Sequence, residues 1–402
     1  MRNLILVAFI FCYFIIANFT SFAQESSRSP ASFDFNDSGL QFMTADSAQK
    51  VMMRFRMQNQ ITYNTISDED FSAASTELAV RRLRLRFGGV LYKYLSFNIQ
   101  LGFARRDFDL TDSDVPNIIR DAAVFWNFSP NAQIGIGQTK LPGNRQRVIS
   151  SGDQQFADRS IVNSYFTLDR DFGIQAYYST KIENIHFNFR GALSNGDGRY
   201  APQLKGADYC YTGRVEVLPL GKFARGGDYF ESDLVREPKP KLSLASTYSI
   251  NEKTTRTRGQ LGRQLLENRT ISMLMADALL KYNGFAFYAE FAQRMCDDPF
   301  TGLDDGAQVY VYAGQGLLLQ GSYIFENNLE IAARMAEVTP DKAIQEYKGA
   351  ELQRHLTGCL TYYISNHRAK AQLEITHNTR ENLVSDISKS NWIGRFNFEL
   401  GI

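Results

Sequence analysis

Apolar and polar side chains alternate with a period of two along most of this chain. From Leu95 to Phe103, every second residue is leucine, phenylalanine or isoleucine. Successive side chains of a strand point to opposite faces, so such a segment predicts a strand with one apolar and one polar face. The pattern recurs in residues 51–60, 81–87, 122–128, 134–136, 172–178, 185–190, 209–217, 242–248, 285–291, 329–335, 356–362 and 369–375, and less regularly in 272–282 and 308–319. With the C-terminal segment we predict about sixteen strands, and a pre-strand near residues 40–44 leaves that count open by about two.

The N-terminus carries the features of an export signal. Arg2 precedes an apolar run that ends near Ile16, and Ser21-Phe22-Ala23 then forms a small-x-small cleavage pattern. We predict a signal peptide over residues 1–23 and one mature domain over residues 24–402. An uncleaved anchor is the alternative, although the run is shorter than the roughly 20 apolar residues that a spanning helix needs.

The rest of the chain favours one large unit. It has no second long apolar segment, which excludes a helical membrane protein. The 44 basic and 43 acidic residues of the full sequence nearly balance, and no linker or charge block divides the chain. The four histidines never pair with cysteines or with each other at metal-ligand spacing, so no metal and no cofactor is predicted. No nucleic-acid partner is predicted either.

The last strand indicates how the sheet ends. Trp392, Phe396, Phe398, Leu400 and Ile402 share one face. A free apolar edge is a liability that closure of a barrel removes, and this ending resembles the signature that the outer-membrane assembly machinery recognises. We therefore predict an all-β fold, a closed antiparallel transmembrane β-barrel of about sixteen strands. A soluble secreted sandwich or lectin-like fold is the alternative.

The connections alternate between short and long, as a meander requires. Short turns are predicted at 283–284, 326–328 and 365–367 on the periplasmic side. Longer polar loops are predicted on the far, extracellular rim, at 107–116, 140–171, 221–239 and 296–306. Gly88-Gly89 is expected to mark a turn or bulge, and Trp126 and Trp392 are expected at strand ends, in the membrane interface.

Arginines dominate the polar face of one strand. Arg82, Arg84 and Arg86 alternate with apolar residues, and no acidic residue interrupts residues 81–86. Arg54 and Arg56 are expected on the neighbouring strand and the same face. In a membrane barrel the polar face lines a wet lumen, so this cluster predicts a field that attracts anions. The alternative is that individual arginines pair with lumen carboxylates such as those of Asp121 and Glu216.

Several motifs together resemble the phosphate-selective porin O and P family, particularly its divergent Bacteroidetes-type members. They are Met53-Arg54-Phe55-Arg56-Met57-Gln58, residues 81–89, Ile119-Arg120-Asp121-Ala122, Gly137-Gln138-Thr139-Lys140-Leu141-Pro142, residues 158–163 and Asp169-Arg170-Asp171-Phe172-Gly173. Weaker echoes, such as Gly213-Arg214 and residues 330–334, extend to the end of the chain.

The resemblance implies a 16-stranded outer-membrane porin of a Gram-negative bacterium, often trimeric, with one loop folded into the channel and basic side chains that guide small anions. Lipid and lipopolysaccharide would surround it. Lys140 falls in the family's Lys-x-Pro element, but the usual second lysine is Gln138 and the aromatic after Pro142 is Gly143. The predicted channel-lining and anion-binding residues are Arg54, Arg56, Arg82, Arg84, Arg86, Arg120, Lys140, Arg190 and Arg214.

Two further questions stay open in the sequence. Residues 140–171 are the best candidate for the inward loop, and their mixed charges allow either a constriction or simple bracing of the loop. The alternatives to an open porin are a plugged structural or surface-attachment barrel and an outer-membrane enzyme. An enzyme is the weaker of these, because the Gly-x-Ser-x-Gly elbow is absent.

Overall fold

The structure is a computed structural model that describes residues 32–36, 39–108, 117–199 and 208–402. The predicted signal peptide lies outside these residues. No helix among the described residues is long and apolar enough to cross a membrane.

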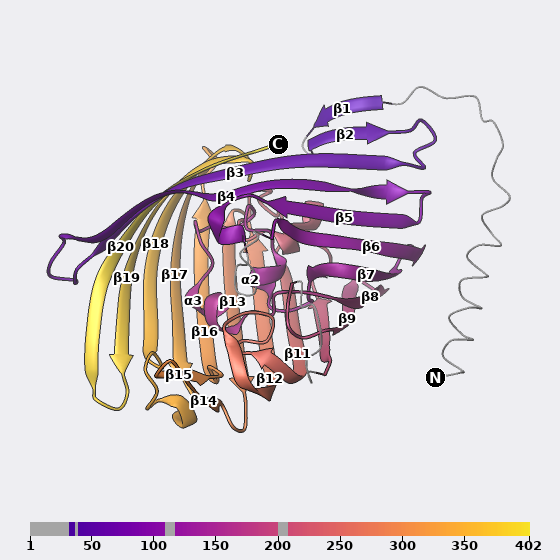
Figure 1. The fold of residues 1–402 in the computed structure, drawn as a ribbon. Helices are drawn as coiled ribbons and strands as arrows, with labels where there is room; N and C mark the ends of the chain where they lie inside the picture. Colours follow the sequence, from indigo (N-terminus) through magenta and orange to yellow (C-terminus); the bar gives the residue numbers. More distant parts are fainter. Residues whose placement is uncertain (1–31, 37–38, 109–116, 200–207) are drawn as a thin grey trace, which may run out of the picture.

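Sixteen strands of the described residues form one closed antiparallel barrel, as predicted (Figure 1). Each strand pairs with its neighbours in chain order, and β20 closes the ring on β3 from Ile393 opposite Asn64 to Gly401 opposite Arg56. The barrel strands are β3 (Lys50–Thr65), β4 (Ala73–Leu91), β5 (Leu95–Gly102), β6 (Ile119–Ser129), β7 (Ala132–Lys140), β8 (Arg170–Ile182), β9 (Ile185–Ser194), β10 (Cys210–Leu218), β11 (Lys241–Arg256), β12 (Gln264–Tyr282), β13 (Phe285–Met295), β16 (Gly314–Ile324), β17 (Leu329–Pro340), β18 (Leu352–Ser365), β19 (Ala369–Asn382) and β20 (Ile387–Gly401).

Two short hairpins lie outside the closed ring. β1 (Ser32–Asn36) and β2 (Gly39–Met43) form the first, and β2 pairs with the start of β3, on the edge whose remainder β20 occupies. The pre-strand near Leu40 therefore exists and adds no strand to the barrel. β14 (Phe300–Asp304) and β15 (Ala307–Tyr310) form the second hairpin, within the connection between β13 and β16.

The period-two pattern corresponds to the two faces of the wall. On β19, Leu373 and Ile375 point outward and are more than half exposed, while Lys370, Gln372 and Glu374 point inward and are buried. An apolar outer face in contact with lipid and a polar inner face is the arrangement that a membrane barrel requires.

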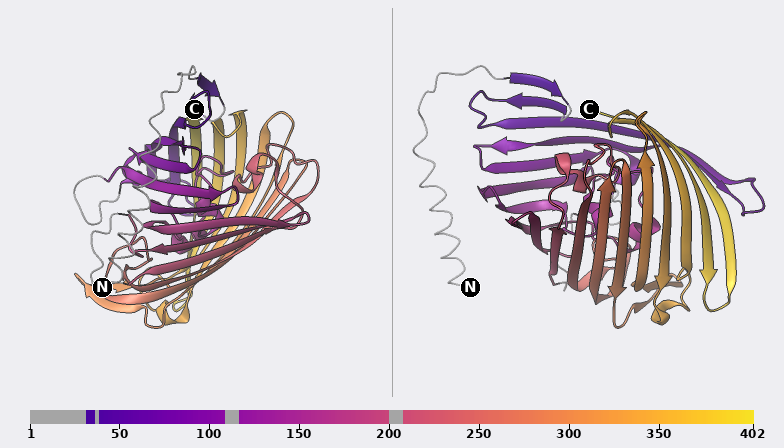
Figure 2. Two further views of the ribbon diagram at one scale, coloured as in Figure 1. Left: turned by 90° about the vertical axis from the view of Figure 1, so that its right-hand side faces the viewer. Right: turned by 180° about the vertical axis from the view of Figure 1, so that it is seen from behind.

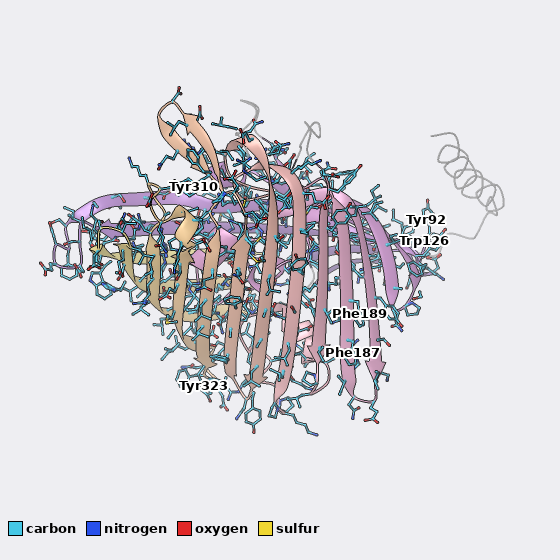
Figure 3. The ribbon with its side chains drawn as sticks, turned by 90° about the horizontal axis from the view of Figure 1, so that it is seen from below. Tyr92, Trp126, Phe187, Phe189, Tyr310 and Tyr323 are labelled. Carbon is cyan, nitrogen blue, oxygen red and sulfur yellow. The ribbon has the colours of Figure 1, made fainter. Side chains whose placement is uncertain are left out.

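Aromatic side chains gather on the outer surface near the short turns. Figure 3 shows Tyr92 and Trp126 beside each other there, and Tyr310 far from them, on the loops. Close ring pairs of this kind are Tyr92 with Tyr94, Trp126 with Phe128 and Tyr323 with Phe325. Amphipathic rings favour the membrane interface, so this rim has the chemistry of a girdle.

The rims have unequal connections. Turns of two to four residues, at 92–94, 130–131, 183–184, 283–284, 325–328 and 366–368, join strands at one rim, and the predicted short turns are among them. The opposite rim carries the connections 103–118, 141–169 and 296–313, which include three of the predicted long loops.

The fourth long loop was assigned to the wrong rim. Residues 219–240 join β10 to β11, and β10 runs toward the rim of short turns. The length and polarity of this segment suggested a loop on the far rim. In an antiparallel meander, however, successive connections lie on alternate rims, so the number of preceding strands decides the side. This segment contains the short helix η2 (Ala224–Tyr229) and turns back into the barrel.

The prediction for Gly88-Gly89 is also wrong. Both glycines lie inside β4 in regular register with Met52 and Val51 of β3. A Cβ on Gly89 would stand 2.0 Å from the carbonyl oxygen of Lys50, so glycine here allows a close approach of two backbones.

Two short helices, α2 (Arg145–Val148) and α3 (Ile161–Phe166), lie inside the barrel, as Figures 1 and 2 show. Val162 and Phe166 of α3 belong to an apolar cluster with the inward-facing Met273 and Leu318. Part of the inner face of β12 and β16 is therefore apolar like the outer face, which explains why residues 272–282 and 308–319 alternate least regularly.

Candidate channel lumen

The predicted arginines of β3 and β4 face each other across the two strands. Arg54 lies opposite Arg86, and Arg56 lies opposite Arg84. Directly opposed like charges destabilise a sheet unless something compensates them. Arg54, Arg56, Arg84 and Arg86 form a concentrated cationic surface on the inner side of the barrel, which we call the arginine wall.

Arg84 of the arginine wall and the neighbouring Arg82 pair with carboxylates from loops. Arg84 binds Asp107 at 2.6 Å, and Arg82 binds Asp158 at 2.9 Å. Arg120 shares Asp107 at 3.0 Å, and Arg81 shares Asp158 at 2.8 Å. The pairing alternative thus holds for these arginines, with acids from connections instead of the strand acids that the sequence suggested.

One pair of the arginine wall, Arg54 with Arg86, has no ion-pair partner in the part of the chain that the structure describes. Arg54 and Arg86 are exposed, and among the described residues no carboxylate lies within ion-pair distance of either. Arg86 donates to Asn98 Oδ1 at 2.6 Å. Arg56 donates to Ser151 Oγ at 2.5 Å and lies 3.6 Å from Glu399.

The other predicted site residues serve as braces. Lys140 Nζ donates to the carbonyl oxygens of Val148 and Ile149 at 2.9 and 3.3 Å. Arg214 is buried and binds Glu216 at 2.8 Å and Asp277 at 2.7 Å. Arg190 lies 3.4 Å from Glu216 and keeps part of its side chain exposed. The structure does not bring these three residues together with the arginine wall.

Residues 141–169, here called the inner loop, fold into the barrel as predicted and cross it. Arg145 is fully buried and donates to Asp277 at 2.5 Å and to Ser243 Oγ at 2.7 Å on one wall. On the other wall, Lys370 Nζ donates to the carbonyl oxygens of Gly152 and Gln154 at 2.9 and 2.7 Å. The charges of the inner loop therefore act largely as bracing.

Residues 219–240, here called the rim segment, meet the inner loop from the opposite side. The backbone of Glu231 donates to the carbonyl oxygen of Asp153, and its carboxylate accepts from the backbone of Gln155, both at 3.0 Å. Lys281 Nζ donates to Gly227 and Ser232 carbonyls at 2.7 Å. This insertion could not be predicted, because the segment has no periodicity that would place it.

Together these two segments close one half of the lumen. The inward side chains of β10–β13 and β16–β19 are mostly buried, including Arg214, Asp277, Glu290, Gln320, Glu330, Thr361 and Gln372. Those of β3–β9 include several that stay partly or fully exposed: Arg54, Arg56, Arg86, Asn98, Gln100, Tyr177 and Arg190. The solvent-accessible path therefore runs along β3–β9 and passes the arginine wall.

Acid should loosen the inner loop. Burial alone would raise the pKa of Asp107, but Arg84 and Arg120 outweigh it and hold the pKa at about 2, and the pKa of Asp158 is likewise lowered by Arg82 and Arg81 against burial. A carboxyl group whose pKa is depressed in the folded protein stabilises the fold at pH values above its unfolded pKa of about 4. This stabilisation, about 2 kcal/mol for Asp107, is lost as the pH falls toward 2.

We expect the unfolding temperature in detergent to fall between pH 4.5 and pH 2.5. The double variant Asp107→Asn with Asp158→Asn should be less stable than the parent at pH 7 and should lose less stability on acidification. Equal acid sensitivity of parent and variant would contradict this account.

Comparisons with known proteins agree with the fold. Residues 51–228 match the model of the family described as phosphate-selective porin O and P, which confirms the resemblance. No curated protein matches the sequence.

Solved structures cover nearly the whole barrel. The outer-membrane channel DcaP of Acinetobacter baumannii superposes with a TM-score of 0.57 at 12% identity, covering 90% of this chain and 99% of that one. OmpF of Salmonella typhi gives 0.55 at 11%, covering 88% and 98%. An anion-selective porin from Comamonas acidovorans gives 0.53 at 12%, covering 88% and 100%. At such identities the likeness shows the fold.

The family match and the barrel support a channel in the outer membrane of a Gram-negative bacterium rather than an enzyme.

Proposed function

Starting from the match of residues 51–228 to the phosphate-selective porin O and P family, we propose that this chain is a porin through which small solutes diffuse, with a preference for anions. It acts in a lipopolysaccharide-containing outer membrane, reached through the barrel assembly machinery, and we include in the proposal a homotrimeric state.

One observation carries the anion preference. Arg54 and Arg86 are exposed on the accessible side of the lumen, and no described carboxylate pairs with them. Fixed charge beside a narrow, partly desolvated path concentrates counter-ions, and guanidinium groups bind oxyanions through paired hydrogen bonds. Water reaches both side chains, so binding stays weak enough for release, as permeation requires.

The proposed preference is for small anions in general and not for phosphate alone. Gln138 replaces the family's second lysine, and the ammonium group of Lys140 is engaged by the carbonyls of Val148 and Ile149. No lysine of this element is therefore available to build a phosphate-specific constriction. The neighbour from Comamonas acidovorans, described as anion-selective, is consistent with this more general preference.

A second candidate is a structural barrel with a closed lumen. It is favoured by the inner loop and the rim segment, which together fill the half of the lumen along β10–β19. Such a barrel would serve in surface attachment or as a structural component of the membrane, and it would not conduct ions.

Planar-bilayer recording of the purified, folded protein separates the two candidates. The porin proposal predicts discrete, voltage-independent conductance steps in 1 M KCl, and liposomes should take up phosphate and chloride faster than lysine. Absence of current from protein whose folding is confirmed by its heat-modifiable gel mobility would contradict the proposal and favour the closed barrel.

A further inference from the structure

Aromatic rings line the accessible half of the lumen beside the arginine wall. The rings of Phe125 on β6 and Tyr177 on β8 lie nearly parallel, with 5.7 Å between their centres. The guanidinium of Arg190 on β9 lies 5.5 Å from the ring centre of Tyr177 and 5.0 Å from that of Tyr229 in the rim segment. We call these four side chains the aromatic sector.

The surroundings hold the aromatic sector in place. A Cβ on Gly135 would lie 2.2 Å from the ring of Phe125, so glycine at that position leaves the space the ring occupies. Tyr177 donates to Gln175, and Arg190 contacts the hydroxyl of Tyr229 and the carboxylate of Glu216. All four members are half-buried, so each keeps part of its surface open to the lumen.

The aromatic sector and the exposed arginines lie at one depth. Each member on a strand is five or six residues from the short turn that ends its strand: Arg86 before Tyr92, Phe125 before Pro130, Tyr177 before Glu183 and Arg190 after Asn184. Arg54 shares this depth because it pairs with Arg86. Three strands lie between β4 and β8, so these two strands are four interstrand spacings, about 19 Å, apart along the wall. Phe125 on β6 is only two spacings from β4.

We propose that this level of the lumen is a binding subsite for organic anions with a flat aromatic ring. The ring of the solute would lie against Phe125 and Tyr177. Stacking on these rings and contact with the guanidinium of Arg190 both favour a flat aromatic solute. The carboxylate or phosphate of the solute would bind Arg54 and Arg86. The charge of Arg190 is already balanced by Glu216, so its part is to present a flat cationic surface. This inference rests on the proposed anion preference and adds a substrate class to it.

Current block by benzoate tests the subsite. Benzoate should reduce the chloride current of the parent at lower concentration than cyclohexanecarboxylate, which has a similar size and charge but no aromatic face. Phe125→Leu and Tyr177→Leu should each raise the half-blocking concentration of benzoate about three- to tenfold and leave that of cyclohexanecarboxylate and the preference for chloride over potassium unchanged.

Tyr178→Leu is the matched control, because Tyr178 neighbours Tyr177 and points to the lipid side, half exposed. It should behave as the parent. Equal block by the two acids in the parent, or unchanged benzoate block in both lumen variants, would overturn the subsite while leaving the anion preference standing. If the parent channel showed no preference for chloride over potassium, the proposed function itself would be overturned. Two lumen variants are used so that misfolding of one still leaves a test.

Discussion

Changing Arg54 and Arg86 together to glutamine is expected to remove most of the channel's preference for anions. These two guanidiniums are the exposed part of the arginine wall, and no described carboxylate lies within ion-pair distance of either. Each contributes about 1 kcal/mol to the potential felt by a monovalent anion some 4 to 5 Å away in water-like surroundings. The ratio of chloride to potassium permeability, measured from reversal potentials, should therefore fall about three- to tenfold, and the effect should shrink at high salt.

The matched control changes Arg263 and Arg354 to glutamine. Arg263 donates to the carbonyl oxygen of Gln308 in a loop, and Arg354 pairs with Glu337 on the outer side of β18. Both variants lose two positive charges, and the control loses them away from the arginine wall. If the two double variants lower the permeability ratio equally, net charge and not the arginine wall sets selectivity.

Removing the rim segment is expected to enlarge the channel. Joining Leu218 to Lys241 through an Asn-Gly turn would delete the carbonyls that Lys281 binds and the contacts between Glu231 and the inner loop. The half of the lumen along β10–β19 would then open at the periplasmic rim, so single-channel conductance should rise severalfold and anion preference should weaken.

A second variant guards against a folding defect in the first. Glu231→Gln with Lys281→Met keeps the chain length and removes the carboxylate that accepts from the inner loop and the ammonium that binds the rim segment. Its conductance should lie between those of parent and deletion. Parent-like conductance in both variants, with folding verified by gel mobility, would show that the rim segment does not limit the channel.

The barrel could be predicted because its two faces meet different solvents. Lipid outside and water or loops inside impose a period of two on each strand. The sequence therefore predicts the strands and places Arg54 and Arg86 on the lumen side. The pattern weakened at β12 and β16, where the inner face carries an apolar cluster that includes residues of α3, so apolar residues such as Met273 are favoured on both sides.

The partners of the arginines could not be predicted from the strand pattern. Asp107 and Asp158, which neutralise Arg84 and Arg82, belong to connections whose course depends on contacts far away in the chain. The inward course of the rim segment could not be predicted for the same reason. Its side of the membrane is fixed by the number of strands before it. The roles of Lys140 and Arg214 as anion sites stay predictions, and their hydrogen bonds favour bracing.

The reversal potential of the unmodified channel across a tenfold KCl gradient tests the central claim most directly. An exposed arginine pair beside the accessible path predicts a potential with the sign of chloride selectivity, and the potential should move toward zero when both salt concentrations are raised tenfold. A potential with the sign of potassium selectivity would contradict the account.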